Sequence, residues 1–252
     1  MNDVRAADGR VVIVAVDHPL YSWPCAGLED RAALIETVSS AGADAVIASY
    51  GTIRDLRPSF GVAAPILKLD LTTVTVGGSY PLTEYVAAWT VEDAQRIGAG
   101  AVLTFIQLGA DFELEALRTA GRVAAAADRA GIPYVCEIMP VESARFPDPY
   151  APVAIVAATR TGAELGAHLV KTSMPTPPEA VRDAVAFGIP VVLAGGDLSA
   201  DPGALFGAVR TAVAVGAAGV AFGRNVWGAD DPAAVVAELV SIVHGQEEVA
   251  HG

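Results

Sequence analysis

Short apolar runs recur along this chain, and most of them directly follow a glycine. The glycine-led runs are Gly42-Ala-Asp-Ala-Val-Ile, Gly100-Ala-Val-Leu, Gly131-Ile-Pro-Tyr-Val, Gly166-Ala-His-Leu-Val, Gly188-Ile-Pro-Val-Val and Gly216-Ala-Ala-Gly-Val. A glycine suits the left-handed position that closes a helix, and an apolar run without polar alternation is typical of a strand buried on both faces. The pattern therefore predicts helices that end at these glycines and buried parallel strands that follow them.

Two further apolar runs, one from Val11 to Val16 and one beginning at Pro65, complete the pattern. The predicted strands cover residues 11–17, 44–49, 65–71, 101–107, 133–139, 168–172, 190–195 and 219–224. Strands that alternate with helical segments in this way indicate an α/β protein, and this number of repeats closes a (β/α)₈ TIM barrel. We expect a single domain over residues 1–252 with its core at about 11–244. A doubly wound open sheet is the alternative, but the alternation of strands and helices does not change at mid-chain.

The segments between the strands carry helical patterns and helix-start signals. Residues 28–40 and 112–129 repeat apolar positions at helical spacing, Thr90 begins a sequence typical of a capping box, and Asp201 and Asp231 each precede a proline. The longer stretches without a clear pattern are 18–27, 50–62, 72–89 and 140–150, each after a strand. In a barrel these would be the loops of the catalytic face.

Composition narrows the class of protein. The chain is 53% hydrophobic with a net charge of −13, which argues against a nucleic-acid-binding or anionic membrane surface. There is no signal-peptide pattern at the amino end and no charge-free apolar stretch long enough to cross a bilayer. We expect a cytoplasmic, homo-oligomeric enzyme that acts on a small molecule.

Polar residues stand at the ends of most predicted strands, and Lys171 is the most informative of them. One interpretation is a lysine at the barrel mouth that is paired with a carboxylate. The other is a nucleophilic amine, kept partly neutral by burial and by nearby cations such as Lys68. Asp17 and Glu137 end strands that face the same lumen, so either carboxylate could move protons for such an amine.

The remaining histidines and cysteines carry weaker signals. His18 could be a second polar group beside Asp17, although a hydrogen-bonded structural role is the simpler interpretation, and the same holds for His168. Because the histidines and the two cysteines, Cys25 and Cys136, lack metal-ligand spacing, we expect free thiols, no metal and no cofactor.

The last two strands end in glycines. Gly195-Gly196 and Gly223-Arg224 fit an anion site in which backbone N–H groups and a guanidinium hold a phosphate. A pair of such ends on adjacent strands is more specific than either alone.

These residues together resemble the Schiff-base aldolase superfamily, which includes archaeal-type class I fructose-bisphosphate aldolase, 2-amino-3,7-dideoxy-D-threo-hept-6-ulosonate synthase and the tagatose- and deoxyribose-phosphate aldolases. The segments that carry the resemblance are Val16-Asp17-His18, Leu67-Lys68-Leu69, Gly162-Ala-Glu-Leu-Gly-Ala-His-Leu-Val-Lys171-Thr172, Val191-Val-Leu-Ala-Gly195-Gly196 and Gly216-Ala-Ala-Gly-Val-Ala-Phe-Gly-Arg224-Asn225-Val226. The resemblance implies that Lys171 forms an imine, that Asp17 is an acid/base carboxylate, and that Gly195, Gly196, Gly223 and Arg224 hold a phosphate, with Lys68 and His18 nearby.

The chain departs from the family pattern at three places. Met139-Pro140-Val141-Glu142 replaces Tyr-Pro-Arg-Gly, so the acid/base tyrosine is missing and we assign its role to Glu137. Gly195-Gly196-Asp197-Leu198 replaces Gly-Gly-Pro-Lys, which favours a monophosphate or a smaller ketose over a bisphosphate. Asp17-His18-Pro19 replaces Asp-His-Gly and stiffens the first loop.

The sequence therefore predicts a carbon–carbon lyase, a class I aldolase that forms a Schiff base between Lys171 and a ketose or ketose phosphate. A Schiff-base transferase that moves a three-carbon or acyl unit is the first alternative. A barrel that binds a sugar phosphate without catalysis is the second.

Overall fold

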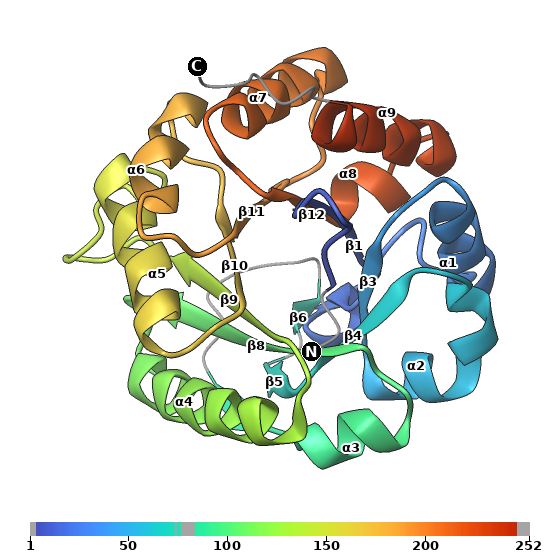
Figure 1. Cartoon of the computed structure of the whole chain (residues 1–252), viewed down its shortest axis with the longest axis horizontal. Helices are drawn as coiled ribbons and strands as arrows, with labels where there is room; N and C mark the ends of the chain where they lie inside the picture. Colours follow the sequence, from blue (N-terminus) through green and yellow to red (C-terminus); the bar gives the residue numbers. More distant parts are fainter. Residues whose placement is uncertain (1–3, 74, 77–83, 246–252) are drawn as a thin grey trace.

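The computed structural model describes residues 4–73, 75–76 and 84–245 of the chain. Its centre is a closed barrel of parallel strands (Figure 1). The strands are β1 (Val11–Ala15), β3 (Ala45–Ala48), β4 (Ala64–Lys68), β8 (Ala101–Leu108), β9 (Tyr134–Pro140), β10 (Leu169–Ser173), β11 (Val191–Ala194) and β12 (Gly219–Phe222). Their order is β1-β12-β11-β10-β9-β8-β4-β3, and β1 pairs with both β12 and β3. The predicted (β/α)₈ barrel is thus confirmed, and the open sheet is excluded.

Helices surround the barrel (Figure 1). They are α1 (Arg31–Ser40), α2 (Tyr50–Leu56), α3 (Val91–Arg96), α4 (Glu113–Ala130), α5 (Pro152–Glu164), α6 (Val181–Val185), α7 (Pro202–Ala214), α8 (Arg224–Trp227) and α9 (Pro232–His244). The capping box at Thr90 is present, and Asp201 and Asp231 cap α7 and α9 before a first-turn proline, as predicted.

The sequence prediction was wrong for part of the loop regions. Residues 50–62 contain α2 and a 3₁₀ helix at Arg57–Phe60. The Ser49 side chain caps α2, and its Thr52 and Ile53 are buried, so tertiary packing outweighs the low helix propensity of this glycine- and threonine-containing segment. Residues 177–187, where the sequence pattern also predicts a helix, form only a 3₁₀ turn at Pro178–Ala180 and the short α6.

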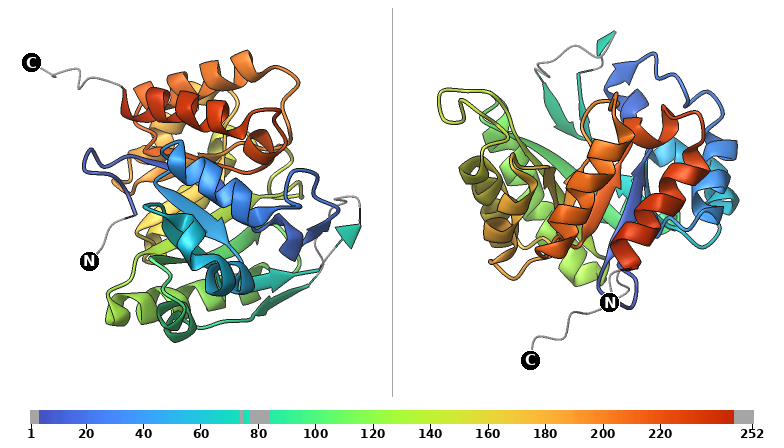
Figure 2. Two further views of the ribbon diagram at one scale, coloured as in Figure 1. Left: turned by 90° about the vertical axis from the view of Figure 1, so that its right-hand side faces the viewer. Right: turned by 90° about the horizontal axis from the view of Figure 1, so that it is seen from above.

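Two small sheets lie beside the carboxyl ends of the barrel strands. β5 (Asp70–Thr72) pairs antiparallel with β7 (Tyr85–Ala87), and β2 (Ser22–Trp23) pairs with β6 (Thr75–Val76). In Figure 2 the strands of the first pair extend beyond the barrel. The β2–β6 pairing joins the loops after β1 and β4, and the β5–β7 pairing forms within the loop after β4; both loops were expected to be irregular.

The lumen of the barrel has its own apolar core. Residues at alternate positions of the strands meet there, among them Ile13, Ile66, Leu103, Val135 and Val192. Strand β12 begins at a close contact: Gly219 has φ +144°, and a Cβ atom there would lie 1.9 Å from the Val11 carbonyl oxygen. Only glycine fits this approach of β12 to β1.

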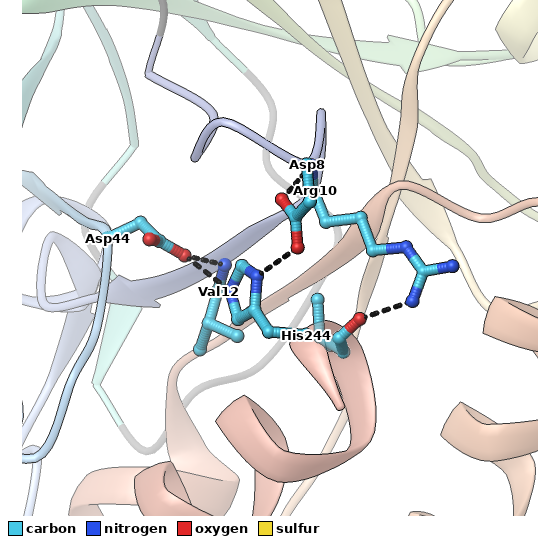
Figure 3. A network of polar contacts seen from close by, with 6 residues as sticks. Asp8, Arg10, Val12, Asp44 and His244 are labelled. Atoms are coloured by element: carbon cyan, nitrogen blue, oxygen red, sulfur yellow. Dashed lines mark hydrogen bonds and ion pairs between the residues drawn. The ribbon is translucent and has the colours of Figure 1, made fainter. Parts of the chain in front are cut away.

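A polar network ties the end of α9 to the amino end of the barrel (Figure 3). His244 contacts the Asp8 carboxylate through Nδ1 at 2.7 Å and Asp44 Oδ2 through Nε2 at 3.0 Å. Asp44 Oδ2 also accepts from the Val12 amide at 2.7 Å, and Arg10 donates to the Val243 carbonyl. The network lies at the amino-terminal face of the barrel, opposite the carboxyl ends of the strands; in TIM barrels this face contributes to stability, whereas the opposite face carries the active site. In the part of the chain that the structure describes, no helix has the length and apolar character needed to span a bilayer.

Candidate active site

The polar layer at the top of the lumen follows from the two-residue period of the strands. Leu103, Val135 and Leu169 belong to the lumen core, and two residues later the same strands present Phe105, Glu137 and Lys171 on the same face. Glu137 pairs in register with both Phe105 and Lys171. The structure therefore brings Glu137 and Lys171 side by side at the carboxyl ends of neighbouring strands.

Lys171 and Glu137 form an ion pair. Lys171 Nζ lies 2.7 Å from Glu137 Oε1, with side-chain exposures of 6% and 11%. Both interpretations of Lys171 meet here, because the carboxylate that pairs with the amine is also within reach to take its proton. A buried ion pair contributes little net stability, so its place at the barrel mouth is better explained by chemistry than by folding.

Lys68 belongs to a second buried network in the same layer. Its Nζ lies 2.7 Å from Asp70 Oδ1 and 4.7 Å from the centre of the Phe105 ring. Asp70 Oδ2 accepts from the Tyr85 hydroxyl at 2.9 Å and from the Phe105 amide at 2.5 Å. Burial alone would lower the pKa of Lys68, but the charges of Asp70, Glu137 and Asp17 outweigh it and hold that pKa above its ordinary value. Lys68 is therefore a fixed cation.

This result limits the activating role predicted for Lys68. Its charge is matched at hydrogen-bond distance by Asp70, so its field at Lys171 is largely compensated. Lys68 and Lys171 are the only lysines in the chain, and both are buried. All other cationic side chains are arginines and histidines.

Asp17 and His18 lie where β1 gives way to the first loop. Asp17 is 3% exposed, and its Oδ1 has no hydrogen-bond partner among the described residues. The His18 ring lies 4.9 Å from the Tyr21 ring and 5.2 Å from the Trp227 ring, and its buried Nδ1 also lacks a partner there. The hydrogen bond expected for a structural His18 is not seen at Nδ1; the ring packs against two aromatic rings and leaves this nitrogen for another group.

His18 is neutral in the folded protein. Burial lowers its pKa from 6.5 to about 3, assisted by the positive charges of Arg224 and Lys171. A neutral imidazole can donate or accept a hydrogen bond but cannot serve as an acid near neutral pH.

The depressed pKa of His18 predicts a pH dependence of stability. As the pH falls below 6.5 the unfolded chain binds this proton, whereas the folded chain does so only near pH 3, so stability is lost across that window. In His18→Gln, the free energy of urea unfolding should fall less steeply between about pH 6 and pH 4, by up to about 1.4 kcal/mol per pH unit. Equal slopes for the variant and the wild type would contradict the assignment.

The glycines predicted to hold an anion lie at the ends of β11 and β12. Gly196 has φ +67° with open space where a Cβ would stand, whereas a Cβ on Gly195 would lie 2.9 Å from the Phe222 ring. A Cβ on Gly223 would lie 2.9 Å from His18 Cε1. The loops therefore pack tightly against the barrel at Gly195 and Gly223 and leave room above Gly196.

Arg224 follows Gly223, and its guanidinium has one paired nitrogen and one without a partner. Its Nη1 pairs with Asp197 Oδ1, while its buried Nε has no partner among the described residues. The neighbouring Asn225, 5% exposed, donates to the carbonyls of Gly195 and Asp197 at 2.9 Å each and accepts from the Ser199 amide at 2.7 Å. Asn225 thus fixes the backbone of the loop that carries Asp197.

Other sequence predictions concern residues outside this cluster. Met139 stands where the family pattern has a tyrosine, and its sulfur accepts a hydrogen bond from Ser173 Oγ at 3.3 Å. His168 Nδ1 accepts from the Tyr134 amide. Cys25 and Cys136 are free thiols, and burial raises the pKa of Cys136 to about 12. Within the described residues, no group of three or more histidine, cysteine and acidic side chains is placed to hold a metal ion.

The sequence comparison establishes the family. The chain matches the DeoC/LacD family aldolase over residues 11–229. It therefore belongs to the DeoC/LacD family, within the class I Schiff-base aldolases.

Individual relatives agree with this assignment. The chain is 35% identical over 242 residues to 2-amino-3,7-dideoxy-D-threo-hept-6-ulosonate synthase of Halobacterium salinarum, covering 95% of this chain and 88% of that protein. It is 30% identical over 236 residues to 2-amino-4,5-dihydroxy-6-oxo-7-(phosphonooxy)heptanoate synthase of Streptomyces griseus, covering 93% and 85%. Among solved structures, an archaeal fructose-1,6-bisphosphate aldolase with its catalytic lysine bound to the carbinolamine intermediate has a TM-score of 0.85, 26% identity and coverage of 96% and 97%.

Three polar residues of the site, Asp70, Tyr85 and Asn225, were not assigned roles from sequence. Tyr85 lies in a stretch expected to be irregular, and its three-residue strand is too short for a periodic signal. Asn225 was noted only as part of the family-like segment, and no pattern predicts that its side chain spans the loop from Gly195 to Ser199.

Proposed function

We propose that this chain is a class I aldolase in which Lys171 forms a Schiff base with a ketose or ketose phosphate. The observation that carries the proposal is the buried contact of 2.7 Å between Lys171 Nζ and Glu137 Oε1. A nucleophilic lysine with a base at hydrogen-bond distance is the arrangement that covalent amine catalysis requires. The family assignment and the relative with a lysine-bound carbinolamine support it.

Glu137 is the proposed acid/base for formation of the imine. It takes a proton from the Lys171 ammonium, and the free amine then attacks the ketone carbon. The proton that the attacking nitrogen loses goes to the carbonyl oxygen and gives a neutral carbinolamine. Protonated Glu137 next returns its proton to the carbinolamine hydroxyl, which leaves as water and gives the iminium ion. This exchange needs one group that is acid and base in turn.

Carbon–carbon cleavage then uses the iminium ion as the electron acceptor. A carboxylate, Asp17 or Glu137, removes the proton from the substrate hydroxyl, an aldehyde departs, and the bonding electrons form an enamine on Lys171. Protonation of the enamine and hydrolysis of the imine release the second product. The partnerless Oδ1 of Asp17 supports a contact between that oxygen and the substrate.

The far end of the substrate is proposed to bind between the last two βα loops. Gly195, Gly196, Gly223 and Arg224 offer backbone amides and a guanidinium there, and Arg224 Nε is still without a partner among the described residues. His18, whose ring lies next to Gly223, is a neutral polar group at this end of the substrate, whereas the charged Lys68 lies across the barrel on β4.

A second candidate is a Schiff-base transferase or synthase, in which the enamine attacks a different acceptor. The names of two relatives, both synthases of seven-carbon amino-containing products, favour it. Proton transfer and the Lys171 imine are the same in both reactions, so only the acceptor distinguishes them.

Isotope exchange tests the proposed imine without knowledge of the acceptor. Because imine formation expels the carbonyl oxygen, the protein should speed the loss of ¹⁸O from labelled dihydroxyacetone or dihydroxyacetone phosphate to water. Product analysis with a panel of aldehyde acceptors then separates cleavage and synthesis from transfer. Exchange at the uncatalysed rate with both ketones would contradict the proposal and favour a barrel that binds without catalysis.

A further inference from the structure

The Asp197–Arg224 ion pair lies at the proposed binding end, where its carboxylate competes with any anionic substrate group. Asp197 Oδ1 contacts Arg224 Nη1, and the Asp197 side chain is 90% exposed. A carboxylate so exposed gains little stability for the fold from this pair. The Asp197 carboxylate instead changes how strongly a substrate group can bind to Arg224.

The backbone around Asp197 is held in place. Asn225, itself buried, bonds to the carbonyl of Gly195, the carbonyl of Asp197 and the amide of Ser199. A side-chain rotation can move the carboxylate, but the loop cannot carry it away from Arg224 without breaking these bonds. With the side chain paired to Arg224, as the structure has it, a phosphate bound above Gly196 would have this carboxylate as a near neighbour.

The charges at this end of the barrel are already unfavourable for an anion. Among the buried charged side chains of the described residues, taken together with the Asp197–Arg224 pair, the carboxylates are Asp17, Asp70, Glu137 and Asp197, and the cations are Lys68, Lys171 and Arg224. Two of the cations are matched by Asp70 and Glu137 at 2.7 Å, and the third is paired with Asp197. A phosphate dianion would bring its charge beside the Asp197 carboxylate, whereas a hydroxyl oxygen could accept from the partnerless Nε of Arg224 without that repulsion.

We infer that Asp197 is a specificity-determining residue that selects a donor ketone whose terminal group is uncharged, such as a hydroxyl, over the corresponding phosphate ester. This inference rests on the proposed aldolase function and narrows its substrate class. Asp197 does not touch the reacting carbons; it acts through the charge it places beside Arg224.

The test compares dihydroxyacetone with dihydroxyacetone phosphate in the wild type and in Asp197→Asn. The wild type should use dihydroxyacetone with the higher kcat/KM. The variant should shift the ratio of the two kcat/KM values toward the phosphate ester roughly tenfold, with the change in KM rather than in kcat. The control Asp230→Asn removes the same charge from an exposed position in the loop after α8 and should leave the ratio unchanged.

Inorganic phosphate gives a second readout that does not depend on turnover. It should protect Asp197→Asn against thermal unfolding at lower concentration than the wild type, because binding to the folded state raises stability. An unchanged substrate ratio together with equal phosphate protection would overturn the role of Asp197. Loss of carbonyl exchange with both ketones would instead overturn the aldolase function, so the two claims fail on different measurements.

Discussion

Replacing Lys171 with methionine should abolish carbonyl chemistry, with kcat falling on the order of 10³-fold or more. Methionine keeps the length and apolar character of the side chain but removes the amine that attacks the ketone. The loss should appear in ¹⁸O exchange as well as in product formation, because both pass through the imine. Turnover near the wild-type rate in this variant would exclude Lys171 as the nucleophile.

The matched control is Lys68→Met, which removes the other lysine of the chain. It should weaken substrate binding yet keep ¹⁸O exchange, since Lys68 is proposed to carry charge and not to form the imine. Both variants break a buried ion pair, which destabilises a protein by about 3–5 kcal/mol. Urea unfolding of each variant should therefore accompany the kinetics, so that loss of chemistry is measured on folded protein.

Replacing Glu137 with glutamine should lower kcat by about 10²–10⁴-fold, the usual contribution of a general acid/base. The amide preserves the size of the side chain and a hydrogen bond to Lys171, but it can no longer exchange protons with the amine or the carbinolamine.

The companion variant Asp17→Asn separates the two carboxylates. If Glu137 handles dehydration and Asp17 handles cleavage, Glu137→Gln should slow ¹⁸O exchange, and Asp17→Asn should slow product formation while exchange continues. A Glu137→Gln protein with wild-type exchange and turnover would remove Glu137 from the mechanism and leave Asp17 as the acid/base candidate.

The barrel was predictable from sequence because its strands are buried on both faces. Runs such as Val11–Ala15 and Ala45–Ala48 are continuously apolar, and glycines such as Gly131, at φ +65°, close the preceding helices. Helix α2 was missed because its stability comes from the burial of Thr52 and Ile53, a tertiary effect that leaves no periodic signal in so short a segment.

The candidate site was predictable residue by residue but not as a set of contacts. The strand period places Glu137 and Lys171 in the lumen once the strands are aligned, yet the pairing of Lys171 with Glu137 and of Lys68 with Asp70 depends on barrel closure and side-chain rotamers. Asp70 is satisfied by Tyr85 from a hairpin that only the folded structure brings over the barrel mouth. Contacts between segments distant in sequence carry no local pattern.

Borohydride reduction followed by peptide mass spectrometry tests the imine most directly. The chain has lysines only at positions 68 and 171, so a ketone adduct on a side-chain amine must lie on one of these two residues. With dihydroxyacetone as the donor, we expect the reduced adduct on the peptide that contains Lys171, and no adduct in Lys171→Met. An adduct on Lys68, or none on either lysine, would contradict the account.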